Sequence, residues 1–489
     1  MNYLINDNMS GELIKIGEIE TCFDAVAYIN KYYQTIVKIY GVDKTIIDTI
    51  ENSDCCYAVI KLNNGDFLNL FNVIISETES SFVSQSINIK LLSSDVIAGS
   101  EKLSMEDRFQ NFSFEITDGV ELMGICPYNL ENDLDLFMPK KVDIPIVYDT
   151  IEAETILGKF SFSAYPKINF EKNGLWLGFE QRIQVTTISL LSVSDFRAIF
   201  ERISSFFQIL CGEIITINRV DITVKTLEDK YKEFEFIGFC NFPKQQLDLW
   251  EKGGIDTPIF LRQSIFKISD FPDINFTLNT WFENYEKMKL SSAAYSRILL
   301  DEDTMICTSN RFLASMQLVE GYISALYDED EHIKLFKKQK KEIISNENNP
   351  ETKEFLKKYC NYVGETFRQS LKKFTYEAVK IFHDLNYNQF DEDFDAFIGT
   401  IKNERDIYTH SSQRNAAKFK DIELLNIATL YKNFYRINLL HRFGLEDDLI
   451  CRRFACNRRF SEYIRRFFNI KLSIPSDLQG FDEKMRDFS

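Results

Sequence analysis

The chain has 489 residues, 45% of them hydrophobic and 27% charged, a composition typical of soluble globular proteins. This length predicts two or three domains. No apolar run approaches a membrane-spanning length, and the first residues show no signal-peptide pattern, so we expect a cytoplasmic protein without membrane contact. The net charge of −17 argues against broad nonspecific binding of nucleic acid.

The negative charge is concentrated in the first part of the chain. Residues 1–300 contain 27 Lys and Arg against 43 Asp and Glu, a net of −16, whereas residues 301–489 contain 30 against 31. Within residues 411–466 the basic residues outnumber the acidic ones by 12 to 6. A basic surface is therefore available in the C-terminal part.

The sequence predicts no metal and no other cofactor. The ten cysteines are scattered without a CxxC pair, which indicates reduced thiols instead of a zinc site or a disulfide framework. No Walker A loop, HExxH motif or GxSxG motif occurs.

From the start to about residue 190 the pattern is mainly β. Period-two or β-branched runs predict strands at 13–16, 57–62, 112–117, 159–163 and 183–188. The polar segment 63–66 between two such runs predicts a hairpin turn. Short strands with polar connections favour a sandwich or barrel-like module, and we place this first β-rich subdomain at residues 1–165.

One helix interrupts the β-rich region. Ser194 is the expected N-cap and Gly212 the expected stop signal. Its predicted buried face consists of Phe196, Ile199, Phe200, Ile203, Phe207 and Leu210. Strand character returns at 213–217 and 234–237, so residues 166–300 form a predicted α+β subdomain with a connecting helix.

From about residue 276 the apolar period becomes helical. The first helix has Trp281, Tyr285, Met288 and Leu290 as its apolar positions, and the acidic segment 301–304 marks the expected domain boundary. Further helices are predicted at about 309–327, 332–345, 351–384 and 418–442, followed by two short arginine-rich helices. The last predicted helix of the four has Ile422, Leu425, Ile427, Leu430, Phe434, Ile437 and Leu440 on its apolar face and ends at Gly444. The fold class is therefore multidomain α+β, with an all-α domain at 301–489.

One polar segment between these helices carries the candidate chemistry. Arg405 and His410 are five positions apart, polar Asp406 follows the arginine, and two serines follow the histidine. Arginine is charged at any accessible pH, and histidine titrates near neutrality. Such a pair can bind a phosphate and transfer a proton without a metal.

The Arg–His spacing alone is weak evidence for a functional site, because Arg436 and His441 have the same spacing. The context of this second pair differs. Apolar Ile437 follows the arginine within an apolar ladder, and His441 falls in the last turn of a predicted helix, where a cation suits the helix dipole. We interpret Arg436 and His441 as structural.

The first pair resembles the signature of the HEPN superfamily (higher eukaryotes and prokaryotes nucleotide-binding): Arg, four to six residues of which the first is polar, then His. The long helix that follows, ending in residues 439–445, also resembles the closing helix of HEPN domains. Together with a β-rich first part of about 300 residues, the arrangement is similar to that of ApeA-type anti-phage proteins. The HEPN resemblance covers about residues 305–470, and its motif consists of Arg405, Asp406 and His410.

The chemistry can be argued from the residues themselves. The 2′-hydroxyl of RNA can attack the adjacent phosphorus, so catalysis requires a proton donor or acceptor near neutral pH and a cation for the phosphorane oxygens. His410 suits the first role and Arg405 the second. Asp406 either orients one of these residues or pairs locally. The resemblance implies that two protomers bring their Arg–His pairs together in one cleft, so a homodimer or a higher homo-oligomer is expected.

Further RNA-binding candidates lie near the motif. Tyr408 either stacks on a base or packs within the helical domain. The arginine-rich helices either follow RNA phosphates or form a solvated face, and their candidate residues are Arg452, Arg453, Arg458 and Arg459.

Two hypotheses of function follow. The first is an anti-phage ribonuclease acting in abortive infection, which cleaves RNA without metal and whose β-rich part senses a phage-derived trigger or restrains the nuclease. The alternative is a noncatalytic HEPN-type scaffold or binding protein that dimerises and recognises a ligand through its β-rich half.

Overall fold

The computed structural model of the chain divides into two compact units, Met1–Arg262 with Phe266–Asn279 (unit 1) and Gln263–Ile265 with Thr280–Ser489 (unit 2). The structure describes residues 8–29, 35–52, 57–80, 87–93, 95–116, 122–124, 129–133, 138–143, 150–171, 174–213, 215, 217–225, 231–237, 266–302, 308–326, 331–359, 367–382, 391–410 and 418–468. The division falls inside helix α5 (Ile274–Glu302). The three-part division expected from the sequence stays a prediction.

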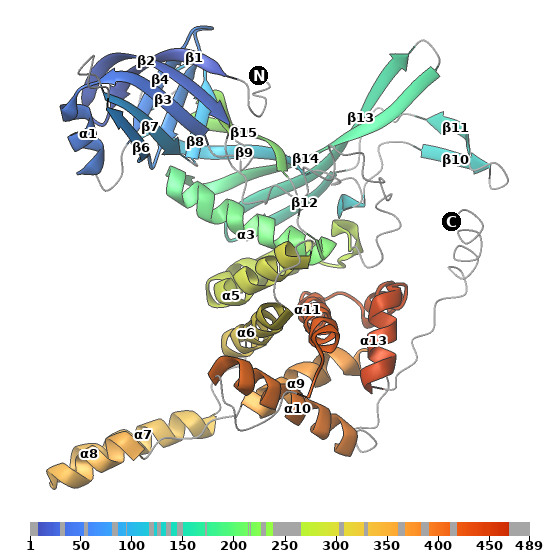
Figure 1. Cartoon of the computed structure of the whole chain (residues 1–489). Helices are drawn as coiled ribbons and strands as arrows, with labels where there is room; N and C mark the ends of the chain where they lie inside the picture. Colours follow the sequence, from blue (N-terminus) through green and yellow to red (C-terminus); the bar gives the residue numbers. More distant parts are fainter. Residues whose placement is uncertain are drawn as a thin grey trace. The chain divides into compact units, whose positions relative to one another are not determined.

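Unit 1 is built on one antiparallel sheet. Among the described residues, 14 strands pair in the order β12-β13-β14-β9-β15-β16-β8-β5-β4-β1-β2-β3-β7-β6 (Figure 1). The strands are β1 (Met9–Ile16), β2 (Ile19–Ile29), β3 (Thr35–Val42), β4 (Ala58–Leu62), β5 (Phe67–Phe71), β6 (Ile74–Ser80), β7 (Ile87–Ser93), β8 (Asp95–Gly99), β9 (Arg108–Ile116), β12 (Thr150–Thr155), β13 (Gly158–Glu171), β14 (Gly174–Leu191), β15 (Ile217–Lys225) and β16 (Tyr231–Ile237). A separate hairpin pairs β10 (Asn129–Asp133) with β11 (Met138–Asp143).

Strands β1–β8 lie together with helix α1 (Lys44–Glu51) in one part of unit 1 (Figure 1). Their buried residues form a hydrophobic core, to which Ile237 of β16 also belongs. Alternate strand residues such as Leu13, Val37 and Ile60 are fully buried, which the period-two pattern of a half-buried strand requires. The predicted hairpin turn is confirmed: β4 and β5 pair, and Gly65 between them has a positive φ of 94°.

Helix α3 (Val193–Cys211) covers one face of the other end of this sheet. All six predicted face residues are buried, and Phe196 and Phe200 contact Phe112 and Phe114 of β9 at ring distances of 4.9 and 5.2 Å. The stop at Gly212 is confirmed, with φ of 75°. The expected N-cap was wrong: Ser192, not Ser194, caps the helix, because its hydroxyl and the Asp195 carboxylate form a reciprocal capping box.

Unit 2 is helical, which confirms the α+β organisation with an all-α C-terminal region. Its helices after α5 are α6 (Thr308–Leu326), α7 (Glu331–Asn346), α8 (Pro350–Tyr359), α9 (Phe367–Lys380), α10 (Asp391–His410), α11 (Asp421–Arg442), α12 (Asp447–Ala455) and α13 (Arg458–Phe468). The single helix predicted at 351–384 corresponds to α8 and α9, with residues 360–366 outside the described residues. None of the described helices is long and apolar enough to span a membrane.

Helix α11 forms the centre of unit 2. Tyr431 and Tyr435 are completely buried in its middle, where their hydroxyls bond to Thr375 of α9 at 2.9 Å and Ser291 of α5 at 3.3 Å. Burial raises the pKa of both tyrosines, that of Tyr435 to about 12, so both hydroxyls stay protonated at physiological pH. This buried helix packs against α6, α9, α12 and α13.

Two predicted core positions are wrong. Leu290 is 81% exposed, because the buried stripe of α5 runs through Trp281, Tyr285, Met288 and Tyr295 and leaves residue 290 off its face. Ile422 is 58% exposed, because α11 begins at residue 421 and its first turn precedes the packed part of the helix.

Candidate functional site

Arg405 lies on the packed face of helix α10. Phe394, Ile398 and Ile401 form a buried row at helical spacing, and residue 405 is the next position of that row. Phe397 anchors the first half of α10 on Phe467 of α13 at a ring distance of 5.2 Å. The arginine is consequently half-buried, with 23% of its side chain exposed.

The guanidinium of Arg405 is held by two carboxylates and one aromatic ring. It donates to Glu320 of α6 and, at 3.2 Å, to the neighbouring Asp406. Its central carbon lies 4.9 Å from the ring centre of Phe367 at the start of α9, a cation–π distance. Three helices therefore position this cation.

Asp406 is part of the same network. It forms an ion pair with Lys402, one helical turn earlier, in which the Lys402 Nζ lies 2.6 Å from the Asp406 Oδ2. Burial acts to raise the pKa of Asp406, but hydrogen bonds from Lys402 and Arg405 outweigh burial, and the pKa lies below the ordinary aspartate value. At neutral pH Asp406 is a carboxylate, which can accept hydrogen bonds but cannot supply a proton.

His410 is the last residue of α10, and its side chain lies outside the described residues, as do the two serines after it. The structure therefore describes the backbone position of the predicted proton-transfer residue and no contact of its ring. The role of His410 stays a prediction.

Glu404, which the sequence analysis missed, connects α10 to the start of α11. It is 1% exposed, and one of its carboxylate oxygens accepts the backbone N–H groups of Lys418 and, at 3.2 Å, Phe419. Its other oxygen is buried without a donor among the described residues. Glu320 was also missed. No local sequence pattern marks Glu404 or Glu320, because each contacts residues that are distant in sequence.

Tyr408 lies half-exposed on α10, with its ring at the edge of Phe312 of α6, 6.3 Å between centres. The tyrosine therefore contacts the helical core on one side. Its stacking on RNA stays a prediction.

The candidate RNA-binding arginines lie on α12 and α13. Arg452 pairs with Asp448 at 2.5 Å on the same helix, Arg453 is half-buried, and Arg459 is exposed, whereas the side chain of Arg458 lies outside the described residues. Through Phe467, α13 contacts α10 at Phe397, eight residues or about 12 Å before Arg405. The C-terminal end of α13 thus contacts the first half of α10, ahead of the motif.

The second Arg–His pair has the structural environment expected for it. Arg436 is 2% exposed inside α11, with its guanidinium 5.4 Å from the ring centre of Phe454. His441 lies in the last turn of α11, and its Nδ1 is 2.6 Å from a carboxylate oxygen of Asp447.

Comparison with known families agrees with this architecture. Residues 313–449, which contain Arg405 and His410, match the family model of the Apea-like HEPN domain, so the helical unit carries a HEPN domain. Residues 17–281 match the model of ApeA N-terminal domain 1, more than half of the chain. The chain belongs to the ApeA family, a membership that suggests a role in anti-phage defence. No curated protein and no solved structure matches it.

Proposed function

We propose that the protein is an anti-phage ribonuclease whose HEPN domain cleaves RNA without a metal ion, with Arg405 and His410 as its catalytic pair. The observation that carries this proposal is the HEPN match, which includes both residues and the intervening polar Asp406. His410 transfers the proton of the 2′-hydroxyl or of the leaving oxygen, and Arg405 stabilises the charge that develops on the phosphorane.

The active site is proposed to form between two protomers. Five residues of α-helix correspond to a rotation of about 500°, so positions 405 and 410 of α10 are about 140° apart around the helix axis. One helix does not present both positions on one face. A second protomer, contributing its own α10, can complete a cleft that contains arginine and histidine together.

Unit 1 is proposed to sense a phage component or to restrain the nuclease until infection, so that RNA cleavage contributes to abortive infection. The carboxylate-rich composition of residues 1–300 supports a role other than RNA binding, because their net charge of −16 repels phosphate.

Cleavage by purified full-length protein tests the catalytic proposal. Cellular RNA is incubated with wild type in the presence of EDTA, and the product ends are analysed. We expect 2′,3′-cyclic phosphate or 3′-phosphate ends, and no cleavage at a position whose 2′-hydroxyl is methylated. The matched controls are His441→Ala for His410→Ala, and Arg368→Ala of α9 for Arg405→Ala. Equal cleavage by His410→Ala and His441→Ala would refute the site assignment.

A noncatalytic scaffold is the second candidate, and one observation favours it. The two carboxylates on Arg405 form an ion-pair network that a purely structural arginine also shows. In that case Arg405→Ala and His410→Ala would retain protection against phage, whereas disruption of the helical bundle would remove it.

A further inference from the structure

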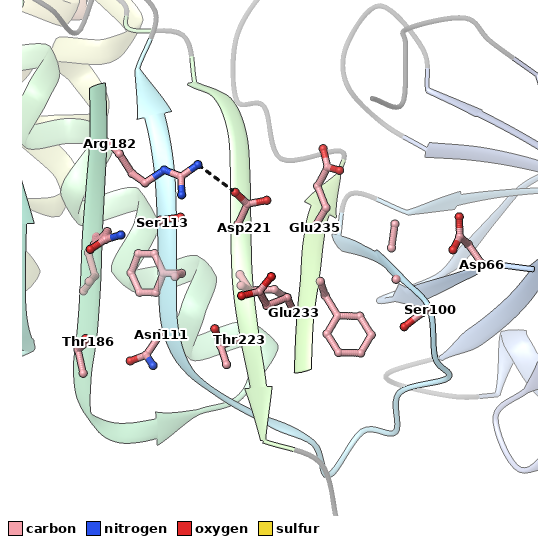
Figure 2. Close-up of a pocket in the computed structure, with 17 residues that line it drawn as sticks. Asp66, Ser100, Asn111, Ser113, Arg182, Thr186, Asp221, Thr223, Glu233 and Glu235 are labelled. Carbon is pink, nitrogen blue, oxygen red and sulfur yellow. Dashed lines mark ion pairs between the residues drawn. The ribbon is translucent and has the colours of Figure 1, made fainter. Parts of the chain in front are cut away.

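The cavity of unit 1 does not suit an RNA phosphate. It has a volume of about 630 Å³ and is lined by residues of β8, β9, β14, β15 and β16, together with Asp66 (Figure 2). Four carboxylates line it, those of Asp66, Asp221, Glu233 and Glu235, against one arginine, Arg182. Carboxylates repel phosphates, so we expect RNA to bind on the surface of unit 2.

The ion-pair network at Arg405 has no net charge. Arg405 and Lys402 contribute two positive charges, and Asp406 and Glu320 contribute two negative ones. The affinity of a protein for RNA depends largely on the cations that neutralise phosphates. Tight binding of an RNA strand at Arg405 therefore requires further cations elsewhere in unit 2.

Helix α7 supplies such cations. Four lysines follow the spacing i, i+3, i+4, i+7, which places their positions within about 100° around the helix axis and along about 10 Å of its length. This lysine face consists of Lys334, Lys337, Lys338 and Lys341. The side chains of Lys338 and Lys341 are exposed, and neither has an ion-pair partner among the described residues, whereas those of Lys334 and Lys337 lie outside the described residues.

Helices α7 and α8 form an arm of unit 2, residues 331–359. They pack against each other, and Figure 1 shows both apart from the other helices of that unit. None of the described side chains between residues 338 and 358 is buried. The described part of the arm is therefore accessible to a ligand and adds nothing to the core of the helical unit.

The arm is inserted in the chain next to the contacts of Arg405. It connects α6 to α9, the two helices that hold the guanidinium through Glu320 and Phe367. Glu331 at the start of α7 follows Leu326 at the end of α6 by five residues, so these two ends are at most about 18 Å apart. An RNA strand bound at Arg405 can therefore reach the arm.

We propose that the lysine face of α7 binds the phosphate backbone of RNA outside the cleavage site, so that one strand contacts both α7 and Arg405. This inference rests on the proposed function for the identity of its ligand. Lysine contacts a phosphate as a point charge and reads no base. The lysine face thus contributes affinity for RNA of any sequence, and the motif contributes the chemistry.

Binding of uncleavable RNA by the full-length protein tests the lysine face. The probe is a fluorescently labelled RNA of about 30 nucleotides with every 2′-hydroxyl methylated, long enough to span more than one ordinary single-strand site. Fluorescence anisotropy at a series of salt concentrations measures the affinity. Lys338→Gln/Lys341→Gln should bind about tenfold more weakly, with the slope of log affinity against log salt reduced by about one to two.

The matched control is Lys287→Gln/Lys289→Gln, which removes two exposed lysines from α5 within unit 2. It should bind RNA as wild type does. Thermal unfolding of both double variants should equal that of wild type, since all four side chains are exposed. No RNA binding by wild type, or equal binding by the two double variants, would overturn the proposal.

The outcomes separate this inference from the nuclease proposal. Protein that leaves unmodified RNA intact but binds the methylated probe through Lys338 and Lys341 contradicts the catalytic pair and supports the lysine face. Cleavage that depends on His410, together with unchanged binding by the α7 double variant, overturns the lysine face alone.

An anionic membrane surface is the alternative partner for the arm, because Ile343 and Phe355 are 56% and 60% exposed in it. Cosedimentation with vesicles of phosphatidylcholine and phosphatidylserine tests this alternative. We expect no sedimentation of the protein with these vesicles. Sedimentation that is lost in Lys338→Gln/Lys341→Gln, while binding of the RNA probe stays unchanged, would assign the arm to lipid and overturn the proposal.

Discussion

Arg405 is the residue on which the proposed chemistry most depends, and in the single protomer its charge is already matched. Glu320, Asp406 and the ring of Phe367 together define where the guanidinium lies. An RNA phosphate has to share or displace one of these carboxylates. Glu320 is the replaceable partner, because it lies on another helix and is 40% exposed.

We therefore expect Glu320→Gln to tighten RNA binding. The change removes a competing anion but retains a hydrogen-bond acceptor for Arg405. A partly exposed ion pair of this kind is worth up to about 1 kcal/mol, so KM should fall by up to about fivefold with little change in kcat. Steady-state cleavage of a short RNA measures both constants. An increase in KM would show instead that Glu320 is needed to position the arginine.

The carboxylate of Asp406 predicts a pH dependence of stability. Its folded-state pKa is lowered, so its contribution is complete above its unfolded pKa of about 4 and is lost as pH falls through the folded value. Asp406→Asn should lower the free energy of unfolding by less than about 1 kcal/mol at pH 7, and the difference should shrink at pH 3. Denaturant titrations at the two pH values measure it, and an equal difference at both would contradict the ion pairs described here.

At the scale of elements, the junction of α10 and α11 depends on one buried side chain. Glu404 accepts the N–H groups of Lys418 and Phe419, the two residues before the N-cap of α11, and without it these backbone donors lose their acceptor. The residue adjacent to the proposed catalytic arginine thus bonds to the segment that leads into the next helix.

Glu404→Ala should destabilise unit 2 by about 1–3 kcal/mol, because both backbone donors lose their buried acceptor. Glu404→Gln keeps one carbonyl oxygen in the same place and should lose less. Thermal unfolding distinguishes the two variants, and RNA cleavage should fall with stability in the same order. Identical behaviour of alanine and glutamine would mean that the hydrogen bonds contribute little.

A second contact between elements joins α12 to the residue after α9. The thiol of Cys451 donates to the carbonyl of Ile381 at 2.7 Å, and burial with nearby Asp447 and Asp448 raises its pKa to about 12. Thiolate is the reactive form, so Cys451 should resist alkylation by iodoacetamide at pH 8, whereas exposed Cys22 should react. Mass spectrometry after a short exposure measures both sites. Equal labelling would indicate that α12 opens readily from the bundle.

How much of the fold and of the candidate site could be predicted depends on how far apart in sequence the contacting residues are. The buried face of α3 follows from local periodicity, and its stop follows from Gly212, whereas the choice between Ser192 and Ser194 as cap depends on the reach of Asp195. The strand order was beyond prediction, since β8 pairs with β5 on one side and with the distant β16 on the other. In the same way, motif spacing indicated Arg405, but Glu320 is 85 residues away from it in sequence.

At the scale of the whole molecule, the negative charge lies mainly in the part of the chain before the proposed nuclease domain. The net charge of −16 belongs to residues 1–300, while residues 301–489 are nearly neutral with a basic segment at 411–466. An anionic RNA is therefore expected at unit 2 and not at unit 1.

The proposed composite active site makes a prediction about mixed dimers. Arg405→Ala and His410→Ala proteins should each be inactive alone, but subunit exchange between them should restore part of the cleavage, since a mixed dimer still has one arginine and one histidine. Cleavage assays before and after exchange measure this, with a monodisperse dimer in sedimentation as the starting condition. No recovery after demonstrated exchange would place each catalytic pair within one protomer.

The pairing of β8 with β16 also governs the order of events during synthesis. The sheet of unit 1 is incomplete until residue 237 has been made, and the HEPN match ends at residue 449. At 5–20 residues per second, a ribosome needs about 10–40 s to make the intervening chain. The proposed regulatory unit can therefore finish folding well before the proposed nuclease is complete.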